Sequence, residues 1–188
     1  MSAVWVRRDE NKLADYLSKY FESDSWSVSS KIFNFYNNMW GPHTFDRFAD
    51  TFNTKCVTFN SKFNCPNTSG VDSFNYNWEH DVNWLVPPVN LVSKCIKHME
   101  KCSAVGTLIV PKWQAAEFWF LLCNPDGSYK LYIIDSIEYV QPLGFYCSRN
   151  VNSTFSNLFK SNALVVRFDC LNYKLQFTRS GGKMKEPN

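Results

Sequence analysis

The segment of the sequence best suited to chemistry is Trp84–Val89. A hydrophobic run ends there in the adjacent pair Pro87 and Pro88. Both proline φ angles are locked, so the backbone carbonyl before them points in a fixed direction. Group transfer to an exocyclic amine uses this geometry, with an acceptor side chain before the prolines and a flat ring after them. Because both flanking positions, Val86 and Val89, are valine, we expect a catalytic loop that has lost its catalytic side chains.

Two carboxylates follow an earlier apolar run. An acidic residue at the end of an early strand often binds a ribose hydroxyl, and Asp46 or Asp50 could do this. The alternative is an exposed surface carboxylate, which spacing alone favours. The sequence has no glycine-rich phosphate loop, so a dinucleotide is not implied.

Four basic or aromatic residues could contact a nucleic-acid backbone, namely Lys55, Lys62, Lys112 and Trp113. The formal net charge of +3 permits such contact but does not argue for it, because the chain has no Lys/Arg stripe. Ordinary surface charge is the competing interpretation, and the sequence favours it slightly. None of the seven cysteines forms a Cys-x-x-Cys pair, so we expect no metal site.

Local patterns predict the elements that must position these residues. Apolar and β-branched runs predict strands at 4–6, 44–48, 83–86, 106–110, 130–135 and 163–168. Helical spacing predicts helices at 12–20, 91–103 and 114–122. A further helix is expected after a cap at Ser25 or Ser27, with an apolar face made of Val28, Ile32, Phe35, Tyr36 and Met39. Residues 56–70 and most of 141–162 are expected to be loops.

The alternation of helices and strands from 27 to 122 is typical of crossover connections and a mostly parallel sheet. We expect an α/β, Rossmann-like fold with helices flanking the sheet and a short N-terminal appendage. Ligands of such sheets bind beyond the carboxyl ends of the strands, which here carry 46–50, 86–90 and 111–113. We divide the chain into an appendage and linker at 1–24, an α/β domain at 25–175 and a flexible tail at 176–188.

Length and composition favour one intracellular domain. A chain of 188 residues is long enough for one sizeable core, and 45% hydrophobic with 20% charged residues argues against disorder. Seven widely spaced cysteines and no apolar signal segment at the start suggest a reducing compartment, nuclear or cytoplasmic. No apolar run approaches the length of a membrane span, so we expect no membrane contact.

A series of short motifs resembles a known family. The motifs lie at 45–49, 53–56, 84–88, 107–111 and 118–119. They resemble phage-type DNA N6-adenine methyltransferases, and still more the domesticated form of that domain in DIRS-type retroelements, which encode a tyrosine recombinase. Residues 11–19 are similar to the end of a retroelement ribonuclease H, which precedes that domain in such polyproteins. Their order and spacing carry the resemblance.

The resemblance assigns roles residue by residue. Asp46 falls where the family has an acidic residue near the S-adenosylmethionine pocket. Val86 falls where the family has Asn or Asp, which accepts a hydrogen bond from the adenine amine. Val89 falls where the family has an aromatic ring that stacks on the flipped base, whereas Pro87 and Pro88 match. We therefore expect no cofactor, and S-adenosylmethionine only if the domain is active.

The free energy lost with the two missing contacts is large enough to argue against adenine methylation by the usual mechanism. Lost base stacking costs about 1–3 kcal/mol, and an unmade hydrogen bond to the amine costs about 1–3 kcal/mol more. At about 1.4 kcal/mol per factor of ten, the rate would fall by roughly tens to ten-thousands. Asn83, Trp84 or Asn90 could substitute only after a local shift, because strand alternation points Asn83 away from the side that Val86 faces.

The ribonuclease H resemblance makes Asp15 the last metal-binding carboxylate of that enzyme. Two-metal hydrolysis needs several carboxylates around paired ions, and Asp15 is the only one of them that the ribonuclease H resemblance includes. We therefore expect Asp15 to be a charge on a helix surface.

Three functions compete. The favoured one is a non-catalytic methyltransferase-like module of a retroelement polyprotein, which acts as an interaction scaffold for DNA, RNA or other parts of that polyprotein. The alternative is an S-adenosylmethionine-dependent DNA adenine-N6 methyltransferase. The third is an unrelated cellular protein with a chance Pro-Pro loop.

Overall fold

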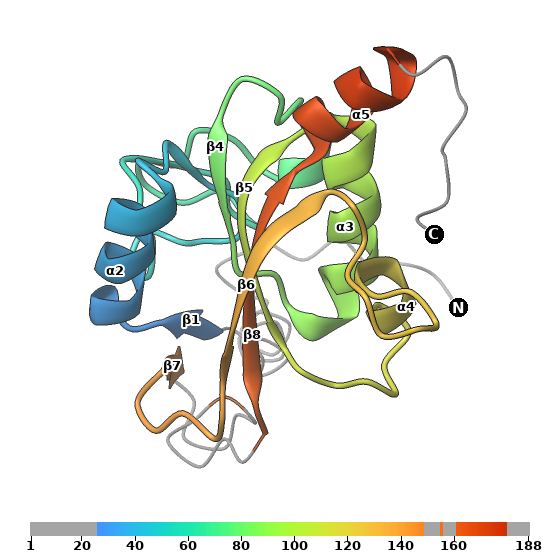
Figure 1. Ribbon diagram of the computed structural model, residues 1–188. Coiled ribbons are helices and arrows are strands. Elements are labelled where there is room, and N and C mark those ends of the chain that lie inside the picture. The colour runs from blue at the N-terminus through green and yellow to red at the C-terminus, as the bar shows by residue number, and fades with distance from the viewer. Residues whose placement is uncertain (1–25, 149–154, 156–160, 180–188) are drawn as a thin grey trace, which may run out of the picture.

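The computed structural model of the chain describes residues 26–148, 155 and 161–179. The predicted strand at 4–6, the predicted helix at 12–20 with Asp15, and the segment from residue 180 onward lie outside the described residues. The described residues form a mixed α/β fold with a six-stranded, mostly parallel sheet flanked by helices (Figure 1). No helix in these ranges is both long and apolar enough to cross a membrane.

The described strands are β1 (Trp26–Val28), β2 (Phe45–Asp46), β3 (Thr58–Phe59), β4 (Val82–Leu85), β5 (Val105–Pro111), β6 (Ile133–Tyr139), β7 (Tyr146–Ser148) and β8 (Ala163–Asp169). The sheet has the order β3-β2-β4-β5-β8-β6. The pairings β2 with β3, β2 with β4, and β4 with β5 are parallel. β8 is antiparallel to both of its neighbours, β5 and β6. β1 and β7 form a separate antiparallel pair.

Helices cover both faces of the sheet. They are α2 (Ser30–Trp40), α3 (Val92–Lys101), α4 (Trp119–Leu122) and α5 (Cys170–Arg179), with 3-10 turns η1 (Ser73–Asn75) and η2 (Val89–Leu91). α2 lies on one face, and α3, α4 and α5 lie on the other (Figure 1). α5 spans residue 175, where the sequence predicted that the α/β domain ends and a flexible tail begins.

Alternation along the strands divides the interior into two cores, one on each face. In β4, Leu85 packs in the core under α3, whereas Trp84 and the residue after the strand, Val86, pack in the core under α2. In β5, Leu108 and Ile109 divide in the same way. Successive residues here therefore face opposite sides of the sheet, as strand alternation predicts.

The start of α2 differs from the prediction. Its N-cap is Ser29, not Ser25 or Ser27, and the Ser29 hydroxyl accepts a hydrogen bond from the Ile32 amide at 3.5 Å. Val28 lies in β1 instead of the helix, because its backbone pairs with Tyr146 of β7.

The apolar face of α2 is also narrower than predicted. Phe35 and Met39 were expected on it but are 47% and 45% exposed, while Tyr36 and Trp40 are the buried residues of the helix. The face that meets the sheet therefore follows Tyr36 and Trp40, which lie one turn apart.

Three further predictions were wrong in extent. The helix expected at 114–122 shrinks to α4, because two turns come before it, closed by hydrogen bonds from the Ala116 amide to the Trp113 carbonyl and from the Trp119 amide to the Ala116 carbonyl. The strand expected at 130–135 begins later, at Ile133, because the Ile133 amide donates to the Lys130 carbonyl and closes a turn first. The loop expected at 56–70 contains the short strand β3, whereas 141–162, expected to be mostly loop, contains only the three-residue strand β7 among its described residues.

Candidate functional site

The carboxyl ends of β2, β4 and β5 meet at one edge of the sheet. Asp46 at the end of β2 is paired with Trp84, and Leu85 at the end of β4 is paired with Leu108. The segments 46–50, 86–90 and 111–113 therefore follow three adjacent strands. The strand order reverses between β2 and β4, because β3 lies on the outer side of β2. Ligands of open α/β sheets bind at such a reversal.

The loop after β4 is packed into the protein. Val86 is 4% exposed and belongs to the core under α2. The Pro88 carbonyl accepts a hydrogen bond from the Leu91 amide at 2.8 Å, which starts the turn into α3. Pro87 is buried, and Val89 is half-buried and contacts both cores. The loop therefore connects β4 to α3 and offers no polar side chain between Val86 and Val89.

A row of aromatic rings packs around this loop. Trp26 of β1 stacks on Phe155, with ring centroids 4.3 Å apart and planes 13° apart. Trp113 stacks on the same ring at 6.4 Å and 27°. Tyr146 of β7 meets Trp26 edge-on at 4.8 Å. Because these rings share a core with Val86, apolar side chains fill the space around that residue.

Asp46 is buried at the end of β2 and serves the adjacent loop. It is 3% exposed, and its two carboxylate oxygens accept hydrogen bonds from the amides of Phe48 (3.4 Å) and Lys55 (3.0 Å). Burial raises the pKa of Asp46 to about 6, against the opposing effect of these hydrogen bonds. A carboxylate covered in this way does not fit the ribose of S-adenosylmethionine. Val86 has no oxygen that could accept a hydrogen bond from an adenine amine.

Three other predicted binding residues also have structural partners. The Asp50 carboxylate accepts hydrogen bonds from the two amides of the turn that follows it, at 2.7 and 3.0 Å. Lys112 forms an ion pair with Glu138 at 2.6 Å. The Trp113 indole N–H donates to the Ser161 hydroxyl at 2.9 Å. These contacts stabilise the loops of the edge.

Lys55 differs from these three, because it lines a surface cleft of about 240 Å³. The cleft lies between the loop after β2 and the β1–β7 pair. Its lining residues are Trp26, Ser27, Phe52, Asn53, Lys55, Cys147 and Ser148. Sequence reasoning found only Lys55 among them; a lone phenylalanine, Phe52, in an otherwise polar run was the one available signal.

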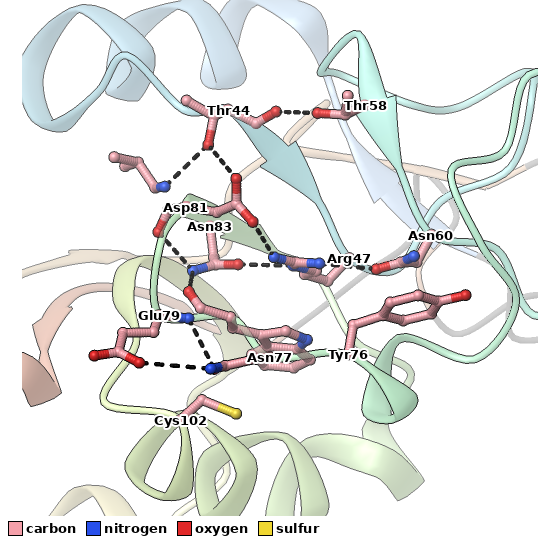
Figure 2. Close-up of polar contacts among 12 residues, drawn as sticks. Thr44, Arg47, Thr58, Asn60, Tyr76, Asn77, Glu79, Asp81, Asn83 and Cys102 are labelled. Atoms are coloured by element: carbon pink, nitrogen blue, oxygen red, sulfur yellow. Dashed lines mark hydrogen bonds and ion pairs between the residues drawn. The ribbon is translucent and has the colours of Figure 1, made fainter.

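Sequence reasoning also missed the most extensive buried polar network, centred on Arg47 (Figure 2). Arg47 is 2% exposed. Its guanidinium donates to Asn83 Oδ1 at 2.7 Å and to Asn60 Oδ1 at 3.1 Å, and it pairs with Asp81 at 2.6 Å. The same group stacks over the Phe45 ring, 3.7 Å from its centroid. Burial lowers the pKa of Arg47, and Asp81 opposes that shift.

The Asn83 amide is also fully engaged. Its nitrogen lies within hydrogen-bond distance of the carbonyls of Trp78 (2.9 Å), Asp81 (2.9 Å) and Val105 (3.0 Å). Because Asn83 is fully buried and its oxygen accepts from Arg47, it presents no acceptor to a substrate amine. The network joins β2, β4 and the loops before and after them.

Within the described ranges, no group of three or more His, Cys, Asp or Glu side chains is placed to hold a metal ion. Comparison of the sequence with profiles of known protein families found no match, and comparison with curated protein sequences found none either.

Proposed function

We propose that this domain is a Rossmann-like, non-catalytic methyltransferase-like module of a retroelement polyprotein, and that it acts as a nucleic-acid-binding scaffold. The Rossmann-like assignment is supported by the parallel strands β3, β2, β4 and β5 and by the reversal of strand order between β2 and β4. The single observation that carries the proposal is the burial of Val86 at the edge where a ligand would bind.

Burial of Val86 argues against methylation more strongly than its identity alone. Adenine would have to displace an apolar core formed with Trp26 and Phe155, in addition to losing the acceptor for its amine. Base flipping already costs a few kcal/mol, which a pocket must recover. A buried apolar position cannot recover it, and the engaged amide of Asn83 offers no replacement acceptor.

A nucleic-acid scaffold needs accessible cations rather than a reactive pocket. Lys55 supplies one beside the cleft, whereas Lys112 is paired with Glu138. We expect the protein to bind labelled DNA or RNA with an affinity that falls as salt rises, by about 0.7–0.9 in log K per log salt for each phosphate contacted. Fluorescence anisotropy over a salt series measures this slope. Binding that does not depend on salt, or no binding at low salt, would refute the scaffold.

The apolar character of the loop predicts a stability effect. Val86→Asn should lower the free energy of unfolding by about 1–3 kcal/mol, because it buries an amide without partners. Urea unfolding measures the change. Val57→Asn is the matched control, since Val57 is 98% exposed and the change there should stay within about 0.5 kcal/mol. If Val86→Asn proved as stable as the parent protein, the space around Val86 would have to be an open polar pocket and not one filled by apolar side chains.

A further inference from the structure

Residues 50–66 present two exposed phenyl rings together with two lysines, and we refer to them as the 50–66 surface. We infer that this surface and the adjoining cleft bind single-stranded nucleic acid, with Phe52 and Phe63 stacking on bases and Lys55 and Lys62 contacting phosphates. This inference rests on the proposed function, because it names the class of nucleic acid and the residues that bind it.

The rings are displayed from an ordered segment. Phe52 is 79% exposed and Phe63 is 54% exposed. The two ends of the segment are joined where the Thr51 hydroxyl donates to the Pro66 carbonyl at 2.8 Å. The Ser61 hydroxyl lies 2.6 Å from the Phe63 carbonyl and restrains the backbone beside that ring. A surface ordered before binding loses less conformational entropy when the ligand arrives.

The lysines favour a nucleic acid over a protein partner. Both ion pairs found among the described residues involve other side chains, so neither lysine is neutralised in this way. Lys62 Nζ lies 5.0 Å from the Phe63 ring centroid, which places a cation beside a stacking ring. Protein interfaces are depleted in lysine, whereas phosphate contacts depend on lysine and arginine.

The cleft is the right size for a fragment of a polymer. Its volume of about 240 Å³ is below the roughly 300–1,000 Å³ of pockets that enclose drug-sized ligands. Lys55 and Phe52 lie in its wall together with Trp26, Ser27 and Asn53, so a cation, a ring and polar groups face the same space. The cleft therefore suits one nucleotide of a longer strand.

Stacking on the exposed rings selects for single strands. In a duplex the faces of each base are covered by its neighbours, so a phenyl ring reaches them only after unstacking, which costs a few kcal/mol. In a single strand every base has an accessible face, whatever the sequence. We therefore expect little sequence preference and a clear preference for single strands.

The test is fluorescence anisotropy of the whole chain with labelled single-stranded DNA, single-stranded RNA and duplex DNA. Phe52→Ala and Phe63→Ala should each weaken single-strand binding about fivefold or more, because stacking contributes about 1–3 kcal/mol per base. Lys55→Gln and Lys62→Gln should each reduce the salt slope by about 0.7. Phe120→Ala, at a 67% exposed position on α4, and Lys97→Gln, on the exposed side of α3, are the matched controls and should change neither value.

The outcomes separate this inference from the proposed function. If the parent protein binds with salt dependence but Phe52→Ala and Phe63→Ala bind as it does, the 50–66 surface is wrong and the scaffold stands. Equal affinity for duplex DNA and single strands would likewise refute the 50–66 surface and leave the scaffold standing. If the parent protein binds no nucleic acid at low salt, both the scaffold and the surface are wrong. All four substituted side chains are at least partly exposed, so circular dichroism should show folded variants.

Discussion

Arg47→Ala should destabilise the protein by about 3–5 kcal/mol, because it removes one member of a buried ion pair and leaves its partners unsatisfied. The Arg47 side chain is 1% exposed, whereas that of Asp81 is 30% exposed and can regain some water. The oxygens of Asn83 and Asn60 cannot regain water, since both residues are fully buried. Urea unfolding monitored by tryptophan fluorescence measures the loss.

A matched arginine separates this network from a general effect of charge. Arg167→Ala removes the same side chain from an exposed position on β8 and should change stability by no more than about 0.5 kcal/mol. Arg47→Lys keeps the charge but lacks the planar fork that reaches Asn83 and Asn60 together, so most of the loss should persist. If Arg47→Ala and Arg167→Ala behaved alike, the network would not hold the strands together.

Most of the sheet and the helices α2 and α3 could be predicted, because local sequence pattern and tertiary environment agree there. The run Gly106–Val110 is β-branched and apolar, and in β5 both faces of that run are buried. In α3, which the helical spacing at 91–103 predicted, the side chains of Cys95, Ile96 and Met99 are fully buried. α5 was not predicted, because only Cys170 among its described side chains is buried and no apolar stripe marks the helix.

Less of the candidate site could be predicted, because its residues are joined by tertiary contacts that do not follow from their spacing in the sequence. Asp46 does lie at the end of a strand, but its oxygens bind amides of its own loop. The cleft around Lys55 combines segments near residues 26, 53 and 147. Arg47 follows Asp46 directly, and nothing in the sequence separates a buried arginine from an exposed one. Apolar periodicity locates a site at an edge, whereas its donors and acceptors depend on tertiary contacts.

Two buried ionisable groups, His43 before β2 and Asp46 at its end, predict a pH dependence of stability that is hidden in the parent protein. His43 is 8% exposed, and burial lowers its pKa to about 4. Asn37 Oδ1, which accepts from the His43 amide, lies 3.2 Å from Nδ1, and Thr107 Oγ1 lies 2.8 Å from Nε2. A neutral ring with the proton on Nδ1 satisfies both contacts, because Nε2 can then accept from the Thr107 hydroxyl.

The two groups act in opposite directions. As pH falls from about 6.5 to 4, the unfolded chain protonates His43 and the folded protein does not, so His43 removes about 3 kcal/mol of stability. Asp46, with a folded pKa of about 6, stabilises the fold below pH 3.8 and loses about 3 kcal/mol as pH rises to 6. Since the windows overlap, the two effects nearly cancel in the parent protein.

Single variants should therefore expose opposite slopes between about pH 4 and 6. Relative to the parent protein, the stability of His43→Gln should fall as pH rises, because the variant lacks the stability that the parent regains when His43 of the unfolded chain loses its proton. The relative stability of Asp46→Asn should rise, because the variant lacks the loss of stability that Asp46 causes in the parent as pH rises. Urea unfolding at several pH values measures both differences, and the other carboxylates cancel because each variant is compared with the parent at the same pH. Two variants with parallel slopes would mean that one of these groups is accessible to water in the folded protein.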